Sequence, residues 1–247
     1  MDVRWVSVFL DVPPDRLDVA AGFWTQVSGT SVGTPVGTAE EFLPLEAVPH
    51  QASLWLQRTS GGPPACHVDL YVEDVPGAVE SSLVLGAARQ HVLDELGVVV
   101  MASPGGMPFC LVGHRGQSVR MTPAGEAGAR TVPDQVCLDV PPGRYDAECD
   151  FWAALTGWAL TDEDVHDEFR RVTRPPAIPF AFLLQRLAEE QDAVTAHLDL
   201  ACEDRDAATR RHVGLGAQEV RRTEGWTVMR DPAGGTYCNT GRRPGAV

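Results

Sequence analysis

Two short segments carry the side chains best suited to chemistry. His67-Val68-Asp69-Leu70 and His197-Leu198-Asp199-Leu200 share the pattern His-x-Asp-Leu. Successive side chains of a β-strand point to opposite faces, so each segment places an imidazole and a carboxylate on one face and leucine on the other. An imidazole can act as a general base, a metal ligand or a hydrogen-bond partner near neutral pH. The pattern therefore indicates one type of polar strand that occurs twice.

Cysteine and lysine usage narrows the possible chemistry. The six cysteines form no Cys-x-x-Cys pair and no zinc-finger spacing, so we expect free thiols, several of them buried, in a reducing cytosol. They are Cys66, Cys110, Cys137, Cys149, Cys202 and Cys238. All twenty basic residues are arginine. The absence of lysine excludes Schiff-base chemistry, a pyridoxal-phosphate anchor and a P-loop lysine.

The overall charge excludes several kinds of partner. The net charge is −14, and no run of basic residues occurs, which argues against nucleic acid and anionic membranes. No apolar run approaches the roughly 20 residues that a membrane-spanning helix needs, and no signal-peptide pattern opens the chain. We therefore expect a soluble cytoplasmic protein, monomeric or homodimeric, whose partner is a small molecule.

The sequence is a tandem duplication. The segment Leu10-Asp11-Val12-Pro13-Pro14 returns 128 residues later at 138–142, and Phe23-Trp24 returns at 151–152 with the same offset. Ordered matches of this kind indicate two equivalent domains. A Gly/Ala/Pro-rich segment separates them, which predicts domains at 1–122 and 131–247.

Each half divides again into two related units. Every unit reads as a strand, a helix and three further strands, with strands dominating and one long helix per unit. The predicted units span residues 1–60, 65–121, 132–188 and 195–242. The fold class is therefore predicted to be α+β, with four β-α-β-β-β units. In the helices, the pairs at 23–24 and 151–152 are expected to pack in the core.

These features resemble the vicinal oxygen chelate superfamily of glyoxalases, bleomycin-resistance proteins and extradiol dioxygenases. The resemblance rests on the His-x-Asp-Leu strand, the Leu-Gly-Ala helix end and the Asp-Pro-x-Gly-Gly turn before the last strand. The segments Phe-Trp-x-x-Leu-Thr-Gly-Trp (151–158) and Leu-Leu-Gln-Arg (183–186) are similar to an actinobacterial glyoxalase-like subfamily. The resemblance implies two glyoxalase-like domains whose curled mixed sheets form cups.

The resemblance also implies where a divalent metal would bind. Members of the superfamily commonly hold a metal with residues of each unit's first strand and a glutamate of the last strand. The first-strand positions here are Ser7, His67, Gln135 and His197, while cysteines 110 and 238 occupy the glutamate positions. Because this carboxylate is missing, no metal is expected. A Zn, Ni, Fe or Mn ion, if bound, would have Gln135, His197 and Cys238 as ligands, whereas the first half offers two donors at best.

Two alternatives to a metal site remain open. Either His-Cys pair, His67 with Cys110 or His197 with Cys238, could form a nucleophile and its base. The preferred hypothesis is a small-organic-molecule-binding protein, and the alternative is a metal-dependent lyase, isomerase or dioxygenase of the glyoxalase type. The second half is expected to hold the main site. The residues expected to contact the ligand are Gln135, Cys137, His197, Asp199, Thr236, Cys238, Trp55 and His67.

Overall fold

The two halves repeat one order of elements in the computed structural model, which describes residues 1–162 and 167–245. The first half comprises β1 (Val3–Val12), η1 (Pro14–Arg16), α1 (Leu17–Ser28), β2 (Ser31–Val32), β3 (Phe42–Val48), β4 (Gln51–Arg58), β5 (Ala65–Val72), α2 (Val75–Val84), β6 (Ala88–Leu93), β7 (Val98–Ala102) and β8 (Pro108–Gly113). The second half comprises β9 (Thr131–Val140), η2 (Pro142–Arg144), α3 (Tyr145–Thr156), β10 (Ala159–Asp162), β11 (Phe169–Thr173), β12 (Ala181–Arg186), β13 (Thr195–Cys202), α4 (Arg205–Gly214), β14 (Gln218–Arg222), β15 (Trp226–Arg230) and β16 (Thr236–Thr240).

Each half forms one eight-stranded mixed sheet. The strand orders are β2-β3-β4-β1-β5-β8-β7-β6 and β10-β11-β12-β9-β13-β16-β15-β14. The pairs β5·β8 and β13·β16 are parallel, while the hairpins beside them are antiparallel. The predicted α+β class with four β-α-β-β-β units in two domains is confirmed. The boundaries at 1–122 and 131–247 stay predictions, and residues 163–166 and 246–247 lie outside the described part of the second domain.

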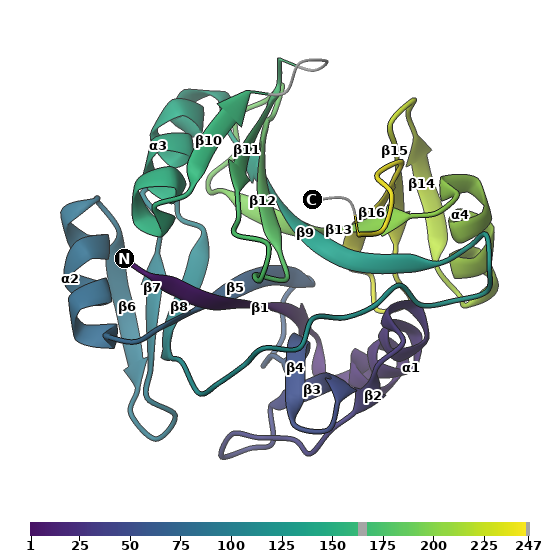
Figure 1. The fold of residues 1–247 in the computed structure, drawn as a ribbon, viewed down its shortest axis with the longest axis horizontal. Coiled ribbons are helices and arrows are strands. Elements are labelled where there is room, and N and C mark those ends of the chain that lie inside the picture. Colours follow the sequence, from purple (N-terminus) through teal and green to yellow (C-terminus); the bar gives the residue numbers. More distant parts are fainter. Residues whose placement is uncertain (163–166, 246–247) are drawn as a thin grey trace. The chain divides into compact units, whose positions relative to one another are not determined.

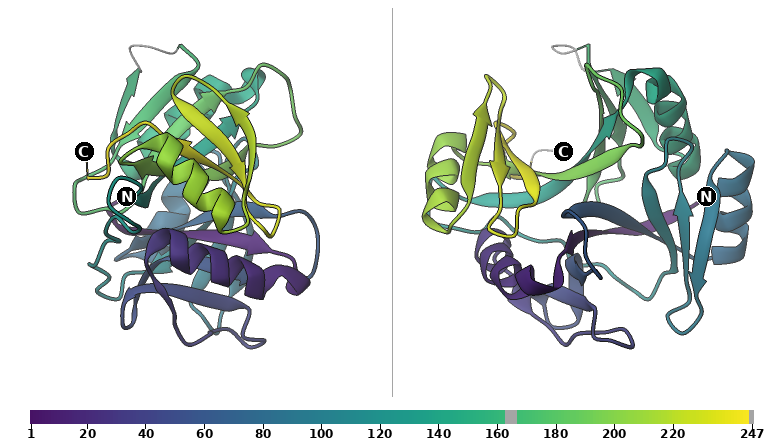
Figure 2. Two further views of the ribbon diagram at one scale, coloured as in Figure 1. Left: turned by 90° about the vertical axis from the view of Figure 1, so that its right-hand side faces the viewer. Right: turned by 180° about the vertical axis from the view of Figure 1, so that it is seen from behind.

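The chain forms two compact units, and each unit contains segments of both halves. The first consists of Met1–Val8, His67–Ser118 and Val136–Ala196, and the second of Phe9–Cys66, Val119–Gln135 and His197–Val247. In the first unit α2 lies along β6 and β8, and in the second α4 lies along β14 to β16 (Figures 1 and 2).

Local sequence signals set the helix ends. The side chains of Asp74 and Asp204 accept hydrogen bonds from backbone N–H groups in the first turns of α2 and α4, as N-cap residues do. Helices α1 and α3 end at Gly29 and Gly157, whose φ values of 67° and 71° are left-handed and favour glycine. Within the described residues, no helix combines the length and apolar character that a membrane crossing requires.

An aromatic core joins α1 to β16 and α4 in the second unit. The ring centroid of Tyr237 lies 5.9 Å from that of Phe23 and 5.2 Å from that of Trp24. The indole Nε1 of Trp24 donates to Asp231 Oδ2 at 2.9 Å. The other oxygen of Asp231 accepts from the N–H groups of Ala233 and Gly235, each at 2.8 Å. One buried carboxylate thus ties the helix to the turn before β16.

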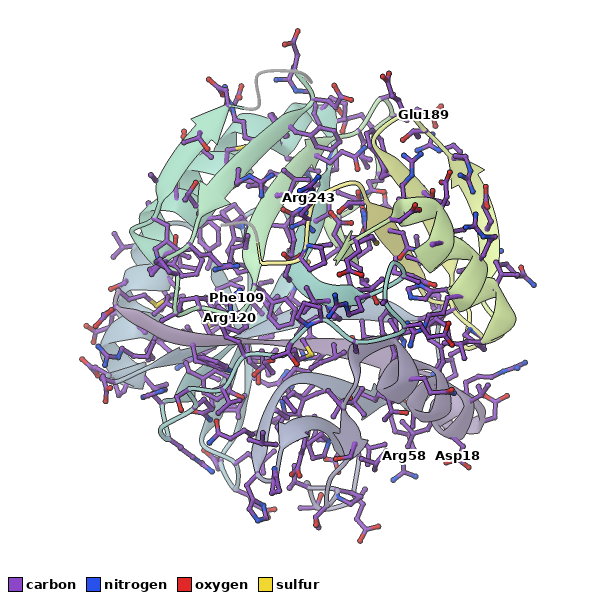
Figure 3. All side chains as sticks on the ribbon, turned by 45° about the vertical axis from the view of Figure 1, so that its right-hand side comes forward. Asp18, Arg58, Phe109, Arg120, Glu189 and Arg243 are labelled. Atoms are coloured by element: carbon purple, nitrogen blue, oxygen red, sulfur yellow. The ribbon has the colours of Figure 1, made fainter. Side chains whose placement is uncertain are left out.

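An equivalent core joins α3 to β8 in the first unit. Phe109, labelled in Figure 3, is fully buried, and its ring centroid lies 6.0 Å from that of Phe151 and 5.4 Å from that of Trp152. Glu148 is fully buried, and its Oε2 accepts from the Trp152 indole at 2.9 Å. Its Oε1 accepts from Ser103 Oγ at 2.8 Å and from the Gly105 N–H. The expectation that both Phe-Trp pairs pack in the core is confirmed.

Each core contains one buried carboxylate, but the two carboxylates lie on different elements. Asp231 lies in the turn before β16, but Ser103 occupies the equivalent turn position before β8. Conversely, Glu148 of α3 corresponds to Ala20 of α1. Since a buried indole N–H needs an acceptor and a buried carboxylate needs donors, each core keeps one acid and one tryptophan. The carboxylate lies in the turn in one core and in the helix in the other, and in both it accepts a hydrogen bond from the tryptophan indole.

Truncating the buried acid should destabilise the protein strongly. In Glu148→Ala the N–H groups of Gly105 and Trp152 lose their acceptor inside the core. We expect the free energy of unfolding to fall by about 2–4 kcal/mol, measured by urea denaturation. The exposed Glu189→Ala is the control and should stay within about 0.5 kcal/mol of the unsubstituted protein. A loss below about 1 kcal/mol for Glu148→Ala would contradict the proposed contribution.

The same carboxylate should give a defined pH dependence. Burial raises the pKa of Glu148, although its three hydrogen-bond donors act in the opposite direction. The folded protein therefore binds this proton more tightly than the unfolded chain, so the stability that Glu148 contributes falls as the pH rises through its folded pKa. As the pH rises from about 4 to about 7, the unfolding free energy of the unsubstituted protein should fall relative to that of Glu148→Gln. A rise relative to that of Glu148→Gln would mean that folding lowers the pKa of Glu148.

Candidate functional site

Four buried or nearly buried polar residues of the second half form what we call the second-half site: Gln135, His197, Asp199 and Cys238. Asp199 and Cys238 are paired in register on β13 and β16, and Leu198 and Leu200 point to the opposite face. His197 Nε2 lies 3.4 Å from Asp199 Oδ1 and 3.5 Å from Cys238 Sγ. The amide of Gln135 donates to Asp199 Oδ2 at 2.7 Å. The strand alternation read from the sequence therefore brings these residues together.

Asp199 is the electrostatic centre of this site. Burial alone would raise its pKa, but the His197 imidazole, the Arg242 guanidinium and the Gln135 amide hold the pKa of Asp199 below its usual value. Arg242 also forms an ion pair with buried Asp134, its Nη2 lying 2.8 Å from Asp134 Oδ1. Asp199 is thus an anion in the folded protein at neutral pH, with its charge compensated by neighbouring groups.

The geometry does not suit a Cys-His-Asp nucleophile triad. In such a triad the base contacts the nucleophile through one ring nitrogen and the orienting carboxylate through the other. Here the same nitrogen, His197 Nε2, faces both Asp199 Oδ1 and Cys238 Sγ. Asp199 does reach the imidazole, but from the side that the thiol also occupies. The arrangement therefore differs from that of a triad, in which the two ring nitrogens serve different partners.

The imidazole and the carboxylate are the donors that would hold a metal ion here. His197 and Asp199 supply a nitrogen and an oxygen atom, donor types that bind borderline divalent cations, and Cys238 Sγ lies 3.5 Å from the same imidazole nitrogen. The sequence predicts Gln135 as the oxygen ligand, whereas the Gln135 amide points its donor at Asp199. A carboxylate on β13 is thus present although β16 has cysteine at the expected glutamate position.

A related cluster occupies the first half. Ligand atoms of His67, Asp69 and Cys110 all lie within 4.8 Å of one another, so a third donor joins the two that the sequence predicts. The His67 Nε2 to Asp69 Oδ1 distance is 3.9 Å. On the same face, Trp5 and Tyr71 pack with Cys110 in a buried hydrophobic cluster. Both aromatic side chains are nearly inaccessible, at 2% and 6% exposure, so this cluster is part of a packed core.

The remaining residues that were predicted to contact a ligand have different surroundings. Cys137 is buried, and its Sγ lies 3.8 Å from Gln185 Oε1. Thr236 is exposed at the beginning of β16, where it pairs with Arg230. Trp55 stacks on Phe9 in the first half, with ring centroids 5.4 Å apart and an interplanar angle of 13°. Ligand contact by these three residues stays a prediction.

Three residues beside the second-half site were not predicted from the sequence. Trp226 of β15 is half-buried and pairs with Thr240, two residues beyond Cys238, which places its side chain on the site's face of the sheet. Asp134 and Arg242 form the buried ion pair described above. The duplication contains a signal for all three, because their equivalents are Val98, Val6 and His114.

Comparison of the sequence with protein families identifies one match. The family described as "Glyoxalase-like domain" matches residues 7–112 and 135–240, one copy in each half. Both segments begin at a first-strand position and end on the last strand of the half. No curated protein sequence matches this chain significantly.

Solved structures with the same fold span nearly the whole chain. The Mn(II)-bound glyoxalase from Novosphingobium aromaticivorans has a TM-score of 0.64 at 16% identity, covering 97% of this chain and 82% of that one. A 2,3-dioxygenase from a Pseudomonas species has a TM-score of 0.64 at 14% identity, covering 100% and 95%. A variant of 4-hydroxymandelate synthase from Streptomyces coelicolor has a TM-score of 0.58 at 15% identity, covering 99% and 94%. At these identities the similarity shows the fold alone.

Removing the donor to Asp199 should destabilise the second half measurably. Gln135→Leu keeps the side-chain size but leaves a buried carboxylate oxygen without its amide donor. We expect the unfolding free energy at pH 7 to fall by about 1–3 kcal/mol in urea denaturation. Gln185→Leu, at a half-buried glutamine of β12, is the matched control and should cost less. Equal losses in the two variants would show that the Gln135–Asp199 hydrogen bond contributes nothing specific.

Proposed function

Because this chain belongs to the family of glyoxalase-like domains, of which it carries two copies, we propose that it binds a small organic molecule at the second-half site. The observation that carries this proposal is the polar chain Gln135–Asp199–His197 with Cys238 beside it. Small-molecule sites combine apolar walls with a few directed polar groups of this kind.

Comparison of the two halves supports the choice of site. Trp5 and Tyr71, which pack with Cys110 in the first half, have the smaller Pro133 and Ala201 as their equivalents in the second half. Trp226 adds a half-buried aromatic ring that the first half lacks at this position, and aromatic rings commonly line sites for small organic molecules. The second half thus pairs polar groups with an aromatic wall.

Fluorescence titration tests this proposal directly. Catechol and 4-hydroxymandelate are suitable first probes, since the fold is shared with proteins named for these compounds. Binding should change tryptophan emission, and the change should shrink in Trp226→Phe. We expect the dissociation constant to rise at least about tenfold in Gln135→Ala and in His197→Ala, since each loses directed hydrogen bonds worth about 1.4 kcal/mol or more.

His67→Ala is the matched control for this titration. It removes the equivalent imidazole of the first half and should leave the dissociation constant unchanged. A loss of affinity confined to His67→Ala would place the ligand in the first half. If neither these probes nor a wider panel of small aromatic and oxo-acid compounds binds, the binding proposal fails.

A second candidate function is metal-dependent lyase, isomerase or dioxygenase chemistry of the glyoxalase type. It is favoured by the His197 imidazole, whose Nε2 lies 3.4 Å from Asp199 Oδ1 and 3.5 Å from Cys238 Sγ. A metal there would polarise an oxygen of the bound molecule as a Lewis acid. Turnover of catechol or of a hemithioacetal in the presence of Zn²⁺, Ni²⁺, Fe²⁺ or Mn²⁺ would support it, provided that chelation and His197→Ala both abolish the reaction.

A further inference from the structure

We propose that the positions of the two buried carboxylates make each half of the chain the packing partner of the other half, and prevent it from pairing with the same half of a second chain. The proposal concerns the two aromatic cores and does not depend on what binds at the second-half site. Both cores contain elements of both halves. Helix α1 packs on β16 and α4, whereas α3 packs on β8. Each half thus contributes one helix to a core that the other half completes.

Because the halves are duplicates, the same elements could also pair between two copies of one half, an arrangement that we call a self-pair. In a self-pair of first halves, α1 would pack on β8 of a second chain. In a self-pair of second halves, α3 would pack on β16 of a second chain. The aromatic side chains suit both arrangements, since the two Phe-Trp pairs are equivalent, as are Phe109 and Tyr237. Aromatic packing alone therefore does not determine which halves pair.

The buried carboxylates distinguish the arrangements. In the observed pairing, the Trp24 indole donates to Asp231 of the turn before β16, and the equivalent indole of α3 donates to Glu148. A self-pair of first halves would combine Ala20 with Ser103 and leave its indoles without a carboxylate. A self-pair of second halves would combine Glu148 with Asp231 and bury two carboxylates beside one indole. Both are costly, because a buried donor needs an acceptor and neighbouring buried carboxylates repel each other.

The shapes of the two turns favour the same pairing. The Gly105 N–H donates to Glu148, and a Cβ atom at position 105 would lie only 2.6 Å from Glu148 Oε1. Glu148 therefore leaves no room for an alanine at this position of the turn. The equivalent residue before β16 is Ala233, whose methyl group would meet the carboxylate in a self-pair of second halves. The glutamate of the helix and the glycine of the turn thus match each other, and they belong to different halves.

Exchanging the acid between the helices should reverse the preference. In Ala20→Glu/Glu148→Ala, each self-pair has one carboxylate for each indole, and the new glutamate of α1 meets the turn that contains Gly105. The pairing within one chain instead places two carboxylates in one core and neither in the other. Sedimentation equilibrium of the full-length double variant should show at least about twice as many chains per particle as for the unsubstituted protein. The two proteins have the same composition and net charge, so neither accounts for the difference.

Gly22→Asp/Asp150→Gly is the matched control for the double variant. It exchanges an acidic residue between the same two helices at exposed positions. The number of chains per particle should therefore stay that of the unsubstituted protein. The proposal is overturned if the double variant is folded and keeps the chain number of the unsubstituted protein, or if the control raises the chain number equally.

A compensation experiment decides the question if the double variant does not fold. Ala20→Glu alone places a second carboxylate beside Asp231 and against Ala233, so the urea midpoint should fall. Adding Asp231→Ser and Ala233→Gly copies the turn of the other core and should recover at least about half of the lost midpoint. The same two turn substitutions without the glutamate should lower the midpoint, because Trp24 loses its acceptor. A smaller recovery would overturn the proposal, since the carboxylate would then not determine which turn a helix accepts.

Discussion

The need to compensate buried carboxylates shapes this protein at every level. A carboxylate removed from water is costly unless hydrogen-bond donors or a cation replace its hydration. Glu148 and Asp231 meet this need with hydroxyl, indole and backbone N–H donors, and each thereby fixes a helix to its sheet. Asp199 meets it with the Gln135 amide and the His197 imidazole. The helix cores and the second-half site therefore differ in which groups provide the compensation.

Because the two halves are copies of one sequence, equivalent positions can be compared to see where buried carboxylates are kept and where they differ. In the helix cores the carboxylate changes element between the halves, yet both cores keep an acid and a tryptophan because packing requires them. On the polar sheet faces the halves diverge instead. The first half packs Trp5 and Tyr71 with Cys110, while the second half has the smaller Pro133 and Ala201 at those positions and adds Trp226. Divergence without loss of packing is expected where one copy retains a site and the other becomes structural.

Much of the fold follows from the sequence, because repeat offsets and strand alternation are local signals. The His-x-Asp-Leu segments correctly place His197 and Asp199 on one strand face, and the Phe-Trp pairs are correctly placed in the core. The sequence predicts Gln135 as an oxygen ligand, but residue type and strand position cannot show that its amide donates to Asp199. The contribution of Asp199 depends on a side-chain direction, and the ion pair Asp134–Arg242 joins residues 108 positions apart in sequence. Neither has a periodic signature.

The central claim is that the polar face of the second half, and not that of the first, retains a working site around His197. Crystals soaked with the small organic compound that binds most tightly test it most directly. The claim predicts electron density for the compound beside His197 and Cys238. Density beside His67 and Cys110 alone, or no density in either half at a saturating concentration, would contradict it.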